Sequence, residues 1–548
     1  MKTKNLNIRT AVFLILSSFV FFFACKDEEE LFPETRLFRP VLNEDLFSEG
    51  NSIIVNMGKM KKATSYTLEV SRDTFKTIDY TIAADTNFVV INSELTGEEL
   101  LWFTIYQVRA IAHASDSEYD SKVSDLGNVR TQKFPSNQGV PTFFDVTDVR
   151  ARVFWTTAGA PVTEVKVFAI DDLRLETPLL EFVVGDDERE AEEKIISGLE
   201  PETEYQIAIY SDGVIRGWEV YTTKAPEPSG DNVIDLKGIY KPSILVDTLP
   251  DIPGGSIVIL ESGLNYELTS GYQLDRSVTL RRGYGFSPDM PVIEFGLHKG
   301  FDVLPGSSID SVVFKDIALR GPYDGSFLFY LNNSGTVGEI KFDACVIGPL
   351  RGGMRINSGT GTLEKLTVVD CLVDSLKDFN FVYMQGKEWT VGDITIKNST
   401  FSKIGSSFIR SANNYNTNSI AIESCTFMET TQATRYIFDW GVDGVEVTNG
   451  ISIHNSIWGP GWNPSGGEDV AIKGFNKLAS TNFDIVNTWA TSDFLFSGNE
   501  IPGFPSFTYS KTAADLWVSP YTDLDFNFKD TGFSGKSDSG DPRWRVGL

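Results

Sequence analysis

Five side chains in the second half of the chain have the chemistry to act on a carboxylate-bearing substrate: Arg355, Lys377, Asp378, Tyr383 and Arg410. An arginine or lysine can neutralise the carboxylate, and a neighbouring base can remove the proton beside it. Together these two steps make a β-elimination. Each residue is better explained as a solvated side chain on a coil exterior, so the set alone does not establish catalysis.

A recurring eight-residue pattern indicates which elements hold these residues. Its places are apolar, any, apolar, any, Asx or small, any, any, apolar, and copies start at intervals of 26 to 32 residues. A period of two predicts β-structure, and one β-strand turn of a solenoid coil per repeat explains the spacing of the copies. Asx residues at the fifth place suit a coil corner. The copies start at Val312, Ile340, Leu366, Ile394, Ile420, Ile451 and Phe483.

Three of the four cysteines, Cys345, Cys371 and Cys425, fall at the sixth place of this pattern. We expect them to form a buried ladder of small side chains. A metal site would need a fourth ligand and a different geometry, so none is expected. A disulfide between Cys345 and Cys371 stays open, because adjacent coils lie about 4.8 Å apart.

A second strand follows each copy and predicts a binding strip. Equivalent places in successive coils line up along the axis, which suits a repeating polymer such as a polysaccharide. We expect Arg355 to be one place out of line with the rest, and arginine would suit a carboxylate because its donors form a fork. The expected strip consists of Arg355, Tyr383, Arg410, Asp439 and Trp440. Three more tryptophans are candidates for stacking on sugar rings, with packing in the core as the alternative: Trp389, Trp458 and Trp462.

The strand order from Ile244 to Ile293, followed by the repeats, resembles the coils of pectate-lyase-like right-handed parallel β-helix proteins. The resemblance covers about residues 232–500 and implies that fold. Pectin hydrolases of this kind carry Gly-His-Gly, Arg-Ile-Lys and paired aspartates, and none of these occurs between residues 300 and 500. We therefore expect no hydrolase. A lyase stays open as the enzymatic alternative; no cofactor is expected, and calcium enters only in that case.

Two segments before the repeats, residues 36–133 and 138–225, show short alternating strands and polar turns. The second places Trp155 in a strand and carries Leu199-Glu-Pro-Glu-Thr-Glu-Tyr205, which resembles the tyrosine corner of fibronectin type III domains. The first is a weaker match. We expect two fibronectin type III-like β-sandwiches that act as spacers, with glycan binding by them as the alternative.

The first 24 residues have the features of a secretion signal. Basic residues precede an apolar stretch that ends at Ala24 and is too short to span a bilayer. Ala24-Cys25 resembles the lipobox of bacterial lipoproteins, which implies cleavage and lipidation at Cys25. The acidic residues that follow resemble the signal for export to the outer face of the outer membrane in Bacteroidota lipoproteins. A plain signal peptide with an incidental cysteine is the alternative.

The complete layout predicts an all-β protein: signal peptide 1–24, acidic tether 25–35, sandwiches 36–133 and 138–225, linker 226–231, and a right-handed parallel β-helix with a carboxy-terminal segment, 232–548. It resembles Bacteroidota surface lipoproteins of polysaccharide-utilisation systems, down to the terminal Gly540-Asp-Pro-Arg-Trp544. That resemblance implies a lipid-anchored outer-membrane protein, exposed at the cell surface, that binds extracellular polysaccharide of acidic or pectin type, with an outer-membrane transporter as a candidate partner. A lyase acting on uronate-containing glycan and a structural or adhesive surface protein are the alternatives.

The net charge argues against one class of partner. The chain of 548 residues has a formal net charge of −27, with 75 Asp and Glu against 48 Lys and Arg. A surface this acidic repels phosphate backbones, so we expect no nucleic-acid binding. An acidic ligand would need locally clustered cations.

Overall fold

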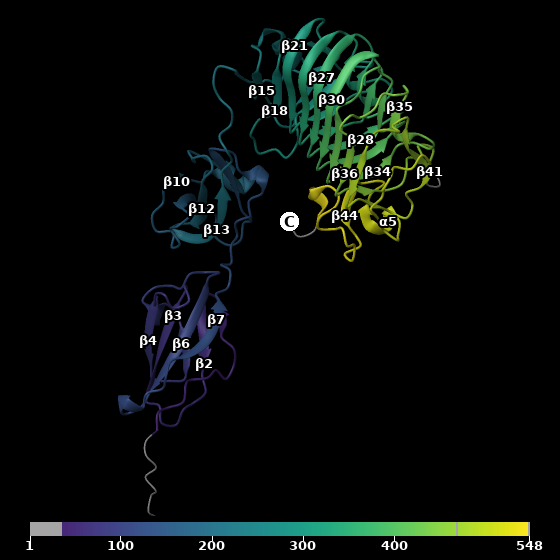
Figure 1. The fold of residues 1–548 in the computed structure, drawn as a ribbon. Coiled ribbons are helices and arrows are strands. Elements are labelled where there is room, and N and C mark those ends of the chain that lie inside the picture. Colours follow the sequence, from purple (N-terminus) through teal and green to yellow (C-terminus); the bar gives the residue numbers. More distant parts are fainter. Residues whose placement is uncertain (1–34, 467–469, 546–548) are drawn as a thin grey trace, which may run out of the picture. The chain divides into compact units, whose positions relative to one another are not determined.

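The computed structural model describes residues 35–466 and 470–545 (Figure 1). The chain divides into two compact units, one made of residues 1–139, 155–189 and 206–219, the other of residues 140–154, 190–205 and 220–548. Nearly all elements are strands, which confirms the all-β class. Within the described residues, no helix has the length and apolar character needed to cross a membrane. Cys25 and the predicted signal peptide lie outside the described residues.

Antiparallel, sandwich-type sheets form the amino-terminal part of the first unit. Their inward-facing residues, such as Ile53, Leu68 and Val108, share one buried cluster. Alternate residues of β3 and β6 are buried, as a half-buried strand requires. The three-stranded sheet is β1 (Phe47–Glu49), β2 (Ser52–Asn56) and β5 (Phe88–Ile91), and the four-stranded sheet is β4 (Tyr80–Ala84), β3 (Ser65–Ser71), β6 (Ile105–His113) and β7 (Ser124–Arg130). A short helix, α2 (Ser93–Thr96), follows β5.

The second predicted module supplies two more antiparallel sheets. Trp155 is 4% exposed, as expected for a core aromatic residue. A short helix, α3 (Asp186–Ala191), lies between β10 and β11 in the sequence. The four-stranded sheet is β10 (Leu180–Val183), β9 (Glu164–Ala169), β12 (Glu204–Ser211) and β13 (Val214–Thr222), and the two-stranded sheet is β11 (Glu193–Ser197) with β8 (Arg150–Phe154).

The tyrosine corner predicted at Tyr205 is present: the Tyr205 hydroxyl accepts a hydrogen bond from the Glu200 N–H at 3.0 Å. The first module repeats it, since the Tyr106 hydroxyl accepts from the Leu101 N–H at 2.9 Å. In both corners a threonine N–H donates to a second threonine hydroxyl, at 2.9 Å in the first and 2.8 Å in the second. The two modules therefore share one local fold, including the module whose sequence match is weaker.

Residues 232–508 form a parallel β-helix, whose strands stack in three sheets that follow one another along each coil (Figure 1). The first sheet contains β14 (Val233–Asp235), β15 (Ser256–Leu260), β18 (Val278–Arg282), β21 (Ser307–Lys315), β24 (Gly335–Asp343), β27 (Thr360–Val369), β30 (Glu388–Lys397), β33 (Ser419–Glu423), β36 (Ile451–His454) and β39 (Phe483–Val486). The second contains β16 (Asn265–Leu268), β19 (Val292–Phe295), β22 (Ala318–Arg320), β25 (Val346–Ile347), β28 (Leu372–Leu376), β31 (Thr400–Ile404), β34 (Thr426–Thr430), β37 (Ile457–Trp458), β40 (Trp489–Ala490) and β42 (Phe507–Thr508). The third contains β17 (Tyr272–Leu274), β20 (Phe301–Val303), β23 (Phe327–Leu331), β26 (Gly352–Ile356), β29 (Val382–Met384), β32 (Ile409–Ser411), β35 (Tyr436–Trp440), β38 (Ile472–Asn476) and β41 (Phe496–Gly498).

The register of the first sheet confirms the eight-residue repeat. Its predicted first places pair in order, from Val312 with Ile340 to Ile451 with Phe483. One coil per copy is confirmed, and each copy contains the end of a first-sheet strand and the beginning of a second-sheet strand. The bend lies at the fifth place, where the backbone turns into the left-handed region that Asn and Asp tolerate. All seven fifth-place residues have a positive φ: Asp316, Ala344, Asp370, Asn398, Ser424, Asn455 and Asn487.

The sixth place forms the expected buried ladder. Cys345, Cys371 and Cys425 are at most 1% exposed, and all three are free thiols, so no disulfide joins Cys345 to Cys371. Their side chains serve as hydrogen-bonding groups between coils instead. The Cys345 N–H donates to the Cys371 sulfur at 3.4 Å, and the Cys371 N–H donates to the Ser399 hydroxyl at 3.0 Å.

Segments outside the coils cover the start of the β-helix core and the exterior of its second sheet. The stretch that begins at Ile244 opens with a short helix, α4 (Ile244–Thr248), and its Leu245 is fully buried in the core. After β42, the chain forms α5 (Ala513–Leu516) and a hairpin of β43 (Trp517–Ser519) and β44 (Asp525–Phe528). Trp517 and Phe526 pack in one cluster with Met428 and Ile457 of the second sheet, so this segment covers the exterior of that sheet.

Candidate functional site

The predicted strip residues lie on the third sheet of the β-helix, and four of them are in one column. Arg355 pairs with Tyr383, Tyr383 with Arg410, and Arg410 with Asp439. The expectation that Arg355 is one place out of line is therefore wrong. Tyr330 precedes Arg355 and Asn476 follows Asp439 in the same register. We call these six residues, Tyr330 to Asn476, the exterior column; each is partly exposed.

Arg355 is held in place by aromatic rings. Its guanidinium carbon lies 4.8 Å from the ring centre of Phe379, 5.1 Å from that of Tyr330 and 5.8 Å from that of Phe327. Nε and one terminal nitrogen donate to the Gln385 side-chain oxygen at 3.0 and 2.8 Å. Two guanidinium nitrogens of Arg355 therefore already donate hydrogen bonds within the protein, which leaves fewer donors for a ligand.

Arg410 is the less occupied of the two arginines. Its guanidinium carbon lies 4.8 Å above the Tyr383 ring centre, and its Nε lies 3.2 Å from an Asp439 carboxylate oxygen. That contact is an ion pair without hydrogen-bond geometry, since Nε is buried and has no hydrogen-bond acceptor among the described residues. The side chain of Arg410 is 37% exposed and that of Asp439 is 14% exposed. The Arg410 guanidinium is thus held in position by Tyr383 and Asp439, while its terminal N–H groups remain available to a ligand.

Trp440 does not belong to this strip. It lies one place beyond Asp439 and is fully buried, because successive residues of a strand point to opposite faces. Trp389 and Trp458 are also buried in the core, and Trp462 is 7% exposed. Trp458 stacks on Phe427 with 3.8 Å between ring centres. Packing in the core is therefore the reading that the structure supports for all four tryptophans.

Lys377 and Asp378, proposed from the sequence for lyase chemistry, are in separate ion pairs. Lys377 binds Asp324, which raises the pKa of the lysine ammonium through a hydrogen bond and charge attraction. Asp378 accepts a hydrogen bond from Arg351 at 2.9 Å. A raised pKa keeps the Lys377 ammonium protonated to higher pH, so its pairing leaves less of the free amine that proton abstraction requires.

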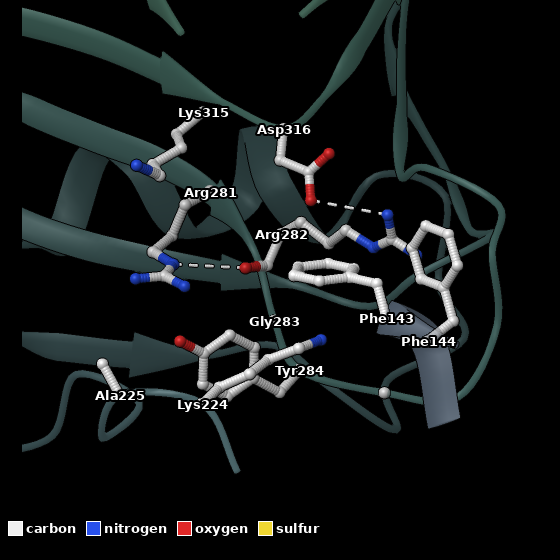
Figure 2. Close-up of a pocket in the computed structure, with 11 residues that line it drawn as sticks. Phe143, Phe144, Lys224, Ala225, Arg281, Arg282, Gly283, Tyr284, Lys315 and Asp316 are labelled. Carbon is white, nitrogen blue, oxygen red and sulfur yellow. Dashed lines mark hydrogen bonds and ion pairs between the residues drawn. The ribbon is translucent and has the colours of Figure 1, made fainter. Parts of the chain in front are cut away.

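A pocket of about 280 Å³ in the second unit contains a cluster of cations that the sequence analysis did not identify (Figure 2). Arg281 and Lys315 are register partners on β18 and β21, so two positive side chains stand directly opposite each other. Lys224 lies at another part of the wall, where its ammonium is 3.8 Å from the Phe143 ring centre. We call this the basic pocket, defined by six residues: Phe143, Lys224, Arg281, Arg282, Tyr284 and Lys315.

The floor of the basic pocket is rigidly built. Arg282 is 7% exposed, donates to the Ser262 hydroxyl at 2.8 Å, and lies 3.4 Å from an Asp316 carboxylate oxygen. Gly283 permits a close approach, since a β-carbon there would lie 2.6 Å from the Ile259 side chain. The carboxylate of Glu227 accepts a hydrogen bond from the Tyr284 N–H. Figure 2 shows the Arg282 contact with Asp316 and the aromatic rings beside it.

The charges of the basic pocket are incompletely balanced. Among residues 35–466 and 470–545, no carboxylate lies within 4 Å of the Lys224 ammonium or the Arg281 guanidinium, and Arg281 donates only to the Arg282 carbonyl, at 3.2 Å. Burial, together with repulsion from Arg282, lowers the pKa of Lys224. Lys315 reaches Asp343 at 3.6 Å, a long ion pair.

Within the described residues, no three His, Cys, Asp or Glu side chains are grouped so that they could hold a metal ion. No family model and no curated protein matches the chain. Among solved structures, the chain is similar to the FN1–FN3 domains of chicken CNTN1, with 16% identity over 34% of this chain and 67% of that one, and a TM-score of 0.15. A TM-score this low adds nothing about function, and the fibronectin-like, sandwich-type character of the amino-terminal sheets rests on their own strands and tyrosine corners.

Proposed function

We propose that the protein is a lipid-anchored surface protein that binds an extracellular polysaccharide along the exterior column. The observation that carries the proposal is the register of Tyr330, Arg355, Tyr383 and Arg410, in which tyrosine and arginine alternate from coil to coil. Coils repeat about every 4.8 Å. A regular polymer can therefore make the same kind of contact several times along the column.

The chemistry of the column favours an acidic glycan. The flat faces of tyrosine and the guanidinium group suit stacking on sugar rings, and an arginine fork binds a carboxylate through two charge-assisted hydrogen bonds. Arg410 supports this most directly, because it has an ion pair but donates no hydrogen bond within the described part of the chain. The neighbouring Asp439 carboxylate would orient the Arg410 guanidinium. It would also repel a ligand carboxylate on its own side, so that the ligand carboxylate could bind Arg410 in one position only.

The anchor and the location are part of the same proposal. The predicted lipidation of Cys25 would attach the protein to the outer membrane, with the two fibronectin-like modules between the anchor and the β-helix. An outer-membrane transporter would then receive the captured glycan. A polysaccharide lyase is not favoured by a specific contact, since Lys377 and Asp378 are both engaged in ion pairs.

Affinity gel electrophoresis on a panel of acidic and neutral polysaccharides tests the proposal. We expect retarded migration in polygalacturonate or another uronate-rich glycan and free migration in neutral glucans. The same mixtures, followed by the ultraviolet absorbance of unsaturated uronate, separate binding from elimination, and we expect no rise. Free migration in every glycan of the panel would contradict the proposal and favour a structural or adhesive role.

A further inference from the structure

We propose that the basic pocket is a second, independent ligand site, which binds one sugar ring carrying a carboxylate or sulfate group. The inference does not depend on the exterior column, since the pocket lies on other strands and shares none of its residues. It rests on three observations: unbalanced cations, exposed aromatic surface and a cavity of suitable size.

The first observation is the arrangement of positive charge. Arg281 and Lys315 face each other on neighbouring strands, and like charges directly opposite are unfavourable. Lys224 adds a third cation on the pocket wall without a carboxylate within 4 Å among the described residues. In a chain with a net charge of −27, acidic residues are plentiful, yet among the described residues none forms an ion pair with Lys224 or Arg281, and Asp316 and Asp148 attract Lys224 only from beyond 4 Å. An oxyanion placed among the three cations would remove the repulsion.

The second observation is the aromatic surface beside the cations. Phe143 is 67% exposed, which is high for a large apolar side chain. The Lys224 ammonium lies 5.2 Å from the Tyr284 ring centre, and the Arg281 guanidinium carbon lies 5.5 Å from it. Figure 2 shows Phe143 and Tyr284 along the same pocket as the cations. An inorganic anion makes no favourable stacking contact with these aromatic faces, whereas the carbon face of a sugar ring can stack on them.

The third observation is the size and stiffness of the pocket. About 280 Å³ is slightly below the range of roughly 300–1,000 Å³ found for small-molecule pockets, so one ring fits better than a polymer. Arg282 is fixed by Ser262 and Asp316 and shapes the floor, and it is the least available of the four cations. Recognition therefore falls to Lys224, Arg281 and Lys315, whose charged groups are not fixed by short ion pairs.

Isothermal titration calorimetry on the full chain tests the site with three probes: trigalacturonate, a sulfated disaccharide and neutral maltotriose. We expect at least one anionic probe to bind, with affinity that falls as salt rises, and maltotriose not to bind. The anionic probe that binds identifies carboxylate or sulfate as the natural group. Absence of binding by both anionic probes would overturn the proposal.

Variants locate the binding. Arg281→Ala and Lys224→Ala should each lower the affinity for the anionic probe by about tenfold or more, because each removes a charge-assisted contact. Lys397→Ala is the matched control, since Lys397 lies on the same sheet but is paired with Glu423 at 3.0 Å. Arg281→Ala should leave the unfolding midpoint unchanged or slightly higher, because it relieves repulsion from Lys315. Unchanged binding in a folded Arg281→Ala variant would contradict the site.

Two further comparisons complete the test. Phe143→Ala should weaken the sugar probe but leave the affinity for inorganic sulfate unchanged; equal affinity of the wild type for sulfate and sugar would contradict recognition of a ring. Arg410→Ala should leave the binding that depends on Arg281 intact and should weaken only the separate binding of trigalacturonate at the exterior column, to which Arg410 belongs. Loss of trigalacturonate binding in Arg410→Ala with retention in Arg281→Ala would reject the basic pocket and leave the exterior column standing.

Discussion

The Asp541 carboxylate accepts a hydrogen bond from the Thr400 hydroxyl at 2.8 Å, although 141 residues separate the two in the chain. Asp541 is 2% exposed, and its other partner is Arg543, whose Nε lies 2.9 Å away. The Trp544 indole N–H donates to the same Thr400 hydroxyl at 2.8 Å. The terminal motif Gly540-Asp-Pro-Arg-Trp544 thus attaches the carboxy-terminal segment to the second sheet of the β-helix through hydrogen bonds to Thr400.

Replacing Asp541 should loosen that attachment. Asp541→Ala leaves Arg543 and the Thr400 hydroxyl without their buried partner, so we expect a loss of about 2–4 kcal/mol in the free energy of unfolding. Urea unfolding followed by tryptophan fluorescence measures it. Lys536→Ala is a control in an exposed part of the same segment. A loss no larger than that of the control would show that the fastening contributes little.

Asp541 should also give the attachment a pH dependence. Burial raises the pKa of Asp541 despite the nearby Arg543, so the folded protein holds the proton more tightly than the unfolded chain does. The proton-linked part of the stability is therefore fully present below the unfolded value near 3.8 and is lost as pH rises through the higher folded value, while the contacts with Thr400 and Arg543 remain. Asp541→Asn should make the unfolding midpoint less dependent on pH over that window. Parallel profiles for wild type and Asp541→Asn would contradict the assignment.

The sulfur ladder makes a prediction that distinguishes packing from hydrogen bonding. Cys371→Ser keeps an acceptor for the Cys345 N–H, as Ser399 does for the Cys371 N–H, whereas Cys371→Ala leaves a buried N–H unpaired. We expect the alanine variant to lose about 1–3 kcal/mol relative to serine. Thermal unfolding compares the two. Equal stability, or rapid labelling of the native thiols, would show that the side chains do not bridge the coils.

The two tyrosine corners should respond alike to removal of the hydroxyl. Tyr106→Phe and Tyr205→Phe each abolish one hydrogen bond to a backbone N–H, so we expect each to cost about 1–3 kcal/mol in its module. Denaturant unfolding detects the change, and Tyr240→Phe, on an exposed side chain, is the control. A cost at Tyr205 without one at Tyr106 would mean that the first corner is not structurally equivalent.

The predicted anchor rests on Ala24-Cys25 following a short apolar stretch. Cys25→Ala removes the thiol that would take the lipid, and a single apolar segment too short to span the bilayer would then not retain the protein. We expect the variant to leave the membrane fraction, which detergent-phase partitioning followed by immunoblotting detects. Cys425→Ala, which alters a buried thiol, is the control. Retention of the Cys25→Ala protein in the membrane would contradict lipid anchoring.

The repeat was predictable because its signal is local. Every copy places apolar residues at fixed positions, so the pairing of Val312 with Ile340 and the burial of Cys371 both followed from the sequence. The exterior column was less accessible, because the segments between strands differ in length and hid the alignment of Arg355 with Tyr383. Trp440 was assigned to the wrong face because adjacent residues of a strand point to opposite faces, so Asp439 and Trp440 could not both belong to the exterior strip.

The basic pocket was not predictable, because its walls come from segments far apart in the sequence. Only Arg281-Arg282, two adjacent cations followed by Tyr284 in an acidic chain, gave a local signal. The approach of Lys224 and Phe143 depends on the folded chain.

Calorimetric titration of a uronate oligosaccharide into wild type, Arg410→Ala, Tyr383→Ala and Arg320→Ala tests the central claim most directly. Arg320 is an exposed arginine on the second sheet, paired with Glu294 at 3.2 Å, and so is the matched control. The exterior column predicts about tenfold weaker binding, roughly 1.4 kcal/mol, for Arg410→Ala and Tyr383→Ala, and wild-type binding for Arg320→Ala. Wild-type affinity in both column variants, with their folds intact, would show that the polysaccharide does not bind there.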